Sequence, residues 1–79
     1  MPIVITISDD GAIAVNNVPI FYKDLAEALR LEVNSSSNRK VMIRADASAS
    51  TADIIAVLRH AKKADIEKIG IATQPGPSP

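Results

Sequence analysis

The sequence has 79 residues, and its nine basic and nine acidic side chains give a formal net charge of zero. A chain of this length forms one domain and buries only about 60% of the surface that its unfolded form exposes, so we expect a thin, two-layer core. The balanced charge argues against sequence-independent nucleic-acid binding, and the lack of cysteine excludes disulfides, thiolate catalysis and zinc knuckles. With one Phe and one Tyr as its aromatic residues, the chain has no platform for stacking bases or sugars.

The first segment, Ile3 to Asn16, predicts a β-hairpin. Isoleucines alternate with smaller or polar residues up to Ile7, and the alternation resumes after Ala12 with Ile13 and Val15 on the inward face. Asp10-Gly11 is the expected tight turn. Two neighbouring carboxylates before a glycine are typical of turns rather than of metal sites when no further ligands follow.

A short connection and a helix are predicted next. Pro19 favours an extended conformation for Val18, so residues 16–19 are expected to connect the hairpin to the helix. The helix is predicted from apolar residues spaced by four, which are Phe21, Leu25, Leu29 and Val33. The polar run Asn34 to Asn38 is predicted as the loop that ends it.

Residues 41–73 predict a β-α-β unit around which the rest of the chain is arranged. Alternating apolar residues indicate strands at 41–45 and 68–73, and one face of the helix between them carries Ile54, Val57, Leu58 and Ala61. Ser50 and Asp53 have the spacing of a capping box, which places the helix start at about Thr51.

The predicted order of elements is therefore β-β-α-β-α-β, an α+β two-layer sandwich with one mixed sheet and two helices on one face. If both crossovers are right-handed, the strands follow the order 1-2-3-4, with strand 68–73 at an edge. We assign residues 1–74 to this domain and residues 75–79 to a disordered, proline-rich tail. No apolar run reaches eighteen residues and no secretory signal pattern occurs, so the chain itself is expected to be soluble.

No catalytic, cofactor-binding or metal-binding site is predicted, and the domain is expected not to be an enzyme. Asp46 is expected to pair locally or to cap its loop, and His60 lies off the apolar stripe and is expected to be exposed. The sheet face away from the helices carries small and mixed residues, and is expected either to be solvated or to meet another chain. Three cations on that face, at Lys40, Arg44 and Lys68, give only a weak basic strip.

Two runs, KVMIRAD and IEKIGIATQP, flank the capped helix and resemble the C-terminal periplasmic domain of the ExbD/TolR family. ITISDDGAIAVNNVPI and DLAEALRLEV are similar to the opening hairpin and first helix of the same family, so the resemblance spans nearly all of residues 2–75. The chain departs from the family at Asp65, where members often have glycine, and in residues 47–50, where members often have a bulkier side chain.

The resemblance implies the periplasmic domain of a single-pass bacterial inner-membrane protein, a subunit of a proton-motive-force-driven complex of the TonB-ExbB-ExbD or Tol-Pal type. Such a domain would act in transmembrane transport or envelope maintenance. It would form a homodimer and bind a TonB- or TolA-like protein, while its membrane helix would contact an ExbB- or TolQ-like subunit. Contact with peptidoglycan is implied mainly for the TolR branch, and no cofactor or nucleic-acid partner is expected.

The interface for these partners is predicted at the edge strand and at the end of the strand beside it. Its residues are Lys68, Ile69, Gly70, Ile71, Ala72, Thr73, Arg44 and Asp46. One alternative stays open, a small ligand-binding regulatory module that works as a dimer. That module needs a glycine-bearing loop after the first strand to receive its ligand, whereas Asp10-Gly11 is predicted in a tight hairpin.

Overall fold

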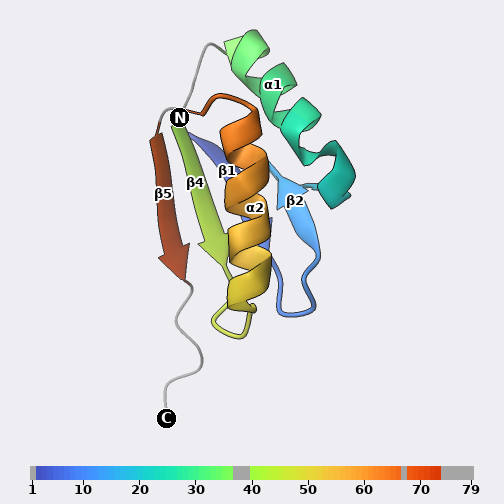
Figure 1. Cartoon of the computed structure of the whole chain (residues 1–79), viewed down its shortest axis with the longest axis vertical. Helices are drawn as coiled ribbons and strands as arrows, with labels where there is room; N and C mark the ends of the chain where they lie inside the picture. The colour runs from blue at the N-terminus through green and yellow to red at the C-terminus, as the bar shows by residue number, and fades with distance from the viewer. Residues whose placement is uncertain (1, 37–39, 67, 74–79) are drawn as a thin grey trace.

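The computed structural model describes residues 2–36, 40–66 and 68–73, which form one five-stranded sheet and two α-helices (Figure 1). The strands are β1 (Ile3–Ile7), β2 (Ile13–Val15), β3 (Val18–Ile20), β4 (Lys40–Ala45) and β5 (Lys68–Thr73). The helices are α1 (Leu25–Ser36), which follows the 3₁₀ turn η1 (Tyr22–Asp24), and α2 (Thr51–Lys63). Both α-helices lie over the same face of the sheet, which confirms the predicted α+β class (Figure 1). Within the described residues, no helix has the length and apolar character needed to cross a membrane.

The first hairpin joins β1 to β2 through a loop centred on Asp9 and Asp10, one residue earlier than predicted. The Gly11 amide donates to the Ser8 carbonyl over 3.0 Å, and Gly11 itself has a left-handed φ of 87°. This pattern is typical of a three-residue hairpin loop with glycine at the left-handed position. Asp10 fixes the loop, because its Oδ1 accepts hydrogen bonds from the Ser8 hydroxyl and from the Ala12 amide.

The predicted connection at residues 16–19 is wrong, because residues 13–20 form a second hairpin. Asn16 and Asn17 have φ values of 48° and 70°, and Val15 pairs with Val18 across them. Two successive left-handed residues make a type I′ turn, which asparagine tolerates better than most side chains. Asn16 also ties the turn to β1, since its side-chain Oδ1 accepts from the Val4 amide over 3.0 Å. The chain thus gains a third strand, β3, that the sequence analysis missed.

The sheet order is β3-β2-β1-β4-β5, which contradicts the predicted order 1-2-3-4. β4 lies parallel to β1, with Ile5 opposite Ile43, instead of beside β2. The extra strand explains the difference, because β3 already occupies the outer side of β2 and leaves the far side of β1 for β4. The expected edge position of the last strand is confirmed, since β5 pairs only with β4 in this sheet.

The core lies between the sheet and the two helices. The sheet contributes alternate residues of three strands, β1, β2 and β4, and the helices contribute one stripe each. Its members are Ile3, Ile5, Ile7, Ile13, Val15, Leu25, Leu29, Val33, Val41, Ile43, Ala45, Val57, Ala61 and Ala64. The α2 stripe is as predicted, with Val57 and Ala61 buried and Ile54 and Leu58 packed partly against the core.

Phe21 is the exception to the predicted α1 stripe. Its side chain is 73% exposed, while Leu25, Leu29 and Val33 are buried. The backbone of Phe21 is extended, with φ −87° and ψ 152°, because the residue precedes the helical segment rather than belonging to it. The helical phase of the later residues therefore does not apply to Phe21. At its other end α1 extends to Ser36, further than predicted, and residues 37–39 of the expected loop lie outside the described residues.

The two ends of α2 are capped as the sequence indicates. The Ser50 hydroxyl accepts from the Asp53 amide over 3.1 Å, so the helix begins at Thr51. Asp65 has a φ of 58°, and the amides of Asp65 and Ile66 donate back to the carbonyls of Lys62 and Ala61. This is a Schellman motif, in which an aspartate occupies the position that glycine usually takes.

Candidate functional site

The predicted interface strand, β5, forms one free edge of the sheet. It runs parallel to β4 from the pair Lys40 and Lys68 to the pair Ala45 and Thr73. An edge strand leaves every second backbone amide and carbonyl without a partner inside the sheet. β5 has six residues and no proline, so its backbone can accept a further strand along its length.

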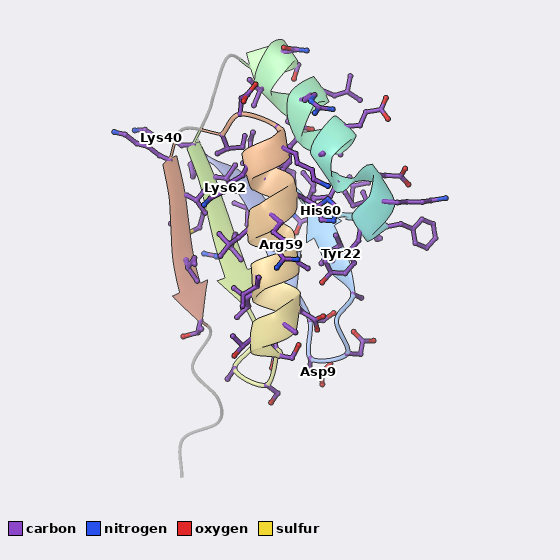
Figure 2. All side chains as sticks on the ribbon, in the orientation of Figure 1. Asp9, Tyr22, Lys40, Arg59, His60 and Lys62 are labelled. Atoms are coloured by element: carbon purple, nitrogen blue, oxygen red, sulfur yellow. The ribbon has the colours of Figure 1, made fainter. Side chains whose placement is uncertain are left out.

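The helix side of β5 is only partly covered. Ile69 and Ile71 share the face of the buried β4 residues Val41 and Ile43, yet Ile71 is 51% exposed. Ile55 of α2 is 45% exposed. Ile55 precedes Lys62 by about two helical turns, so the two residues lie on the same side of α2. Figure 2 shows that the Lys62 side chain extends from α2 toward β4 and β5. Ile55 and Ile71 therefore border the free edge with exposed apolar surface, which we call the β5 margin.

Arg44 and Asp46 lie apart from the β5 margin. Arg44 projects from β4 on the sheet face away from the helices, between Thr6 of β1 and Ala72 of β5 in register, and is exposed. Arg44 and Asp46 line the same shallow hollow of about 340 Å³ on that face. The eight predicted interface residues therefore flank one half of the sheet but do not share a single face.

Asp46 has the loop role that was predicted. Its Oδ1 accepts from the Ser48 amide over 2.8 Å, and its carbonyl accepts from the Ala49 amide over 2.9 Å. Its own amide donates to the Ile7 carbonyl over 2.8 Å, which extends the β1–β4 contact past the end of β4. The carboxylate thus holds the loop that leads into α2.

A polar cluster that the sequence analysis did not find lies between η1, α2 and the β1–β2 loop. The rings of Tyr22 and His60 are 6.2 Å apart, and Figure 2 shows the two side chains next to each other. His60 is half-buried, so the expectation of an ordinary exposed histidine is wrong. The carboxylate of Asp53 fills the space over Gly11, where an added Cβ would lie 2.9 Å from its Oδ2. The i, i+7 spacing of Asp53 and His60 places both on one side of α2 and was the available signal.

The hydroxyl of Tyr22 is buried and has no hydrogen-bond partner among the described residues. Burial raises the pKa of Tyr22 above its usual value of 10.0, and the negative charge of Asp53 raises it further. Tyr22 is therefore neutral at physiological pH, which does not suit a general base. No group of three or more metal-ligating side chains occurs in the described ranges.

A comparison with protein families finds that the model of "Biopolymer transport protein ExbD/TolR" matches residues 1–76, essentially the whole chain. A search of curated proteins finds no match. The family match agrees with the resemblance carried by the opening hairpin, the first helix and the β4-α2-β5 unit.

Proposed function

The chain belongs to the ExbD/TolR family of biopolymer transport proteins, and from that premise we propose that it is the periplasmic domain of an inner-membrane subunit in a proton-motive-force-driven complex. The complex is of the TonB-ExbB-ExbD or Tol-Pal type. The family is transport-associated and non-enzymatic. In this proposal the domain dimerises and binds a TonB- or TolA-like protein, while a membrane helix contacts an ExbB- or TolQ-like subunit.

The observation that carries the proposal is the free β5 edge with its partly exposed margin. An extended segment added beside β5 would satisfy the outward backbone groups and would cover Ile55 and Ile71. Covering the exposed half of each isoleucine contributes about 1 kcal/mol. Main-chain pairing would supply affinity, and the apolar margin would favour segments with an apolar residue at every second position.

Sedimentation equilibrium over a range of concentrations tests this proposal. We expect the wild-type domain to self-associate and Ile71→Lys to weaken self-association at least about tenfold, since the change removes apolar contact and places a charge on the edge. Leu31→Lys is the matched control, because Leu31 is also exposed, at 64%, but lies on α1. Equal association of both variants would contradict a β5 interface.

Backbone amide shifts on adding a peptide from a TonB-like periplasmic segment test the partner. Shifts confined to residues 68–73 and their β4 neighbours support strand addition at β5. The alternative, a small ligand-binding regulatory module, would be supported by a different result. In that case the domain stays monomeric and does not bind the peptide, and the amides near Gly11 shift when a free amino acid is added.

A further inference from the structure

The sheet face away from the helices, which we call the open face, has no second layer over it within the described part of the chain (Figure 1). Its side chains alternate along β1, β2 and β4 with those that enter the core. Around its centre lie small or apolar residues, which are Val4, Thr6, Ala14, Met42, Gly70 and Ala72. Two hollows, of about 340 and 410 Å³, meet on this face, because both are lined by Thr6 and Arg44. Sheets with faces of this kind pack on a second sheet at a distance of about 10 Å.

The charged side chains at the two ends of the open face have opposite signs. β1, β4 and β5 are parallel, so they begin at one end of the sheet and finish at the other. Lys40 and Lys68 pair in register where β4 and β5 begin. Asp46 directly follows β4 at the other end, and Figure 2 shows Asp9 at that end and Lys40 at the opposite one. Arg44 lies nearer the middle of β4. The open face is therefore basic where the parallel strands begin and acidic where they finish.

We propose that the open face packs against the open face of a second copy of this chain, with the strands of the two sheets antiparallel. Identical faces meet about a twofold axis, which lies either along the strands or across them. An axis along the strands would bring the two lysine ends together, whereas an axis across them places each lysine end over the acidic end of the other copy. Glu32 also borders the lysine end, but on the β2 side, where the side-chain amide of Asn16 donates to it over 3.3 Å. The charges around β4 and β5 therefore favour the antiparallel packing.

The register of this contact follows from β4. Lys40 and Asp46 lie three residues before and three residues after Ile43. A twofold axis level with Ile43 therefore stacks Lys40 on Asp46 of the second copy, and makes the same contact a second time with the roles exchanged. On β1 the same axis sets Val4 against Thr6, so small side chains meet at the centre of the contact.

The area of the open face limits the strength of the contact. Five strands about 4.8 Å apart and up to six residues of about 3.3 Å each give at most about 400 Å² per copy. Stable complexes bury about 800 Å² per partner, so a single pair of faces should associate only in the millimolar range.

Pairing at β5 would double this area. If two copies add their β5 strands antiparallel, their twofold axis is perpendicular to the sheet and both open faces point the same way. A second such pair then covers both faces at once, which gives a closed tetramer with about 800 Å² buried per pair. This stronger form rests on the β5 proposal, whereas the contact between two single faces does not.

Amide shifts measured over a range of concentrations in Ile71→Lys test the face contact by itself, because this variant weakens pairing at β5. We expect shifts at residues 4–6 and 42–46 that grow up to millimolar concentration, and none at residues 25–36 of α1. In sedimentation equilibrium the variant should stop at dimers, while the wild type proceeds to tetramers. Absence of concentration-dependent shifts at residues 4–6 and 42–46 would overturn the proposal.

Charge reversal in the Ile71→Lys chain tests the antiparallel packing. Lys40→Glu should weaken the face contact about tenfold, since it turns two attractions into two repulsions. Arg59→Glu is the matched control, because it changes the net charge equally at an exposed position of α2, and it should alter association by less than about twofold. Equal weakening by both variants would overturn the pairing of Lys40 with Asp46.

A mixture of two variants distinguishes a specific contact from general repulsion. Asp46→Lys alone should weaken association, but in a mixture with Lys40→Glu opposite charges face each other at both positions, and association should return to within about threefold of the parent chain. Asp46→Lys loses the hydrogen bond that the Asp46 carboxylate accepts from the Ser48 amide. Asp46→Asn keeps an oxygen for that bond, and we expect it to weaken association about threefold. A mixture that associates no better than its components would overturn the antiparallel packing.

The results also separate this proposal from the one for β5. If the wild type and Ile71→Lys associate equally and both show the shifts on the open face, the β5 contact is wrong and the face contact stands. If the wild type dimerises while Ile71→Lys stays monomeric and shows no such shifts, the face contact is wrong and the β5 contact stands.

Discussion

At one edge of the sheet, β3 has three residues with a proline in the middle, and at the other, β5 has six residues and no proline. Both edges carry exposed apolar side chains, at Val18 and Phe21 on one side and at Ile55 and Ile71 on the other. The two edges differ in their backbone, because only β5 has a continuous row of outward amides and carbonyls that can pair with another strand. Similar exposed apolar residues therefore border one edge whose backbone can accept a further strand and one whose backbone cannot.

Substituting Gly11 in the β1–β2 loop and Gly70 on β5 should give the largest difference in stability between the two halves of the sheet. Gly11→Ala should lower the free energy of unfolding by about 2 kcal/mol, since Gly11 has a φ of 87° and a Cβ would meet Asp53 at 2.9 Å. Gly70→Ala on β5 should change it by less than about 0.5 kcal/mol, because Gly70 has no left-handed φ and its Cβ would meet only the flexible end of Met42, at 3.2 Å.

Urea unfolding of the two variants measures this contrast. For a domain of this size, a loss of about 2 kcal/mol also lowers Tm by roughly 10 °C. Equal destabilisation by the two substitutions would mean that the β1–β2 loop does not hold the tight contact with α2 described here.

The elements that the sequence predicted correctly are those whose signals are local. The Ser50 cap, the α2 stripe and the alternation of β1 and β2 each follow from residues a few positions apart, and the structure confirms them. The strand order depended on a strand that was not recognised. Asn16-Asn17 was the available signal, because asparagine tolerates two successive left-handed positions and so predicts a two-residue hairpin turn.

The candidate surfaces were harder to predict than the fold. The edge position of β5 was predicted from topology, but its exposure depends on how far α2 extends over the sheet, which sequence spacing does not determine. Phe21 fits the period of Leu25 and Leu29, so its exposure follows only from knowing that the helical segment begins after it. Tyr22 and His60 are far apart in sequence and meet only through the packing of η1 on α2.

Replacing Pro19 tests whether this proline is what prevents strand pairing at β3. Pro19→Thr restores an amide that points away from β2, on a residue type that favours strands. We expect self-association to strengthen about threefold to tenfold, with new amide shifts at residues 18–20 that grow with concentration. The double variant Pro19→Thr with Ile71→Lys isolates the β3 contribution. If Pro19→Thr leaves self-association unchanged in both the wild-type and the Ile71→Lys chain, proline is not what prevents pairing at this edge.

The smallest expected effect lies in the turn between α2 and β5. Asp65 holds a φ of 58°, a conformation that costs an L-residue up to about 1 kcal/mol and that glycine adopts freely. Asp65→Gly should therefore raise the free energy of unfolding by about 0.5 kcal/mol, since the loss of the interaction that Asp65 makes offsets part of the gain. Asp65→Asn is the control that keeps a side chain suited to this conformation, and it should be nearly neutral. Because the substitution leaves β5 and its margin untouched, self-association should stay at the wild-type level. A parallel change in association and stability would mean that the turn, and not only the strand, contributes to the β5 interface.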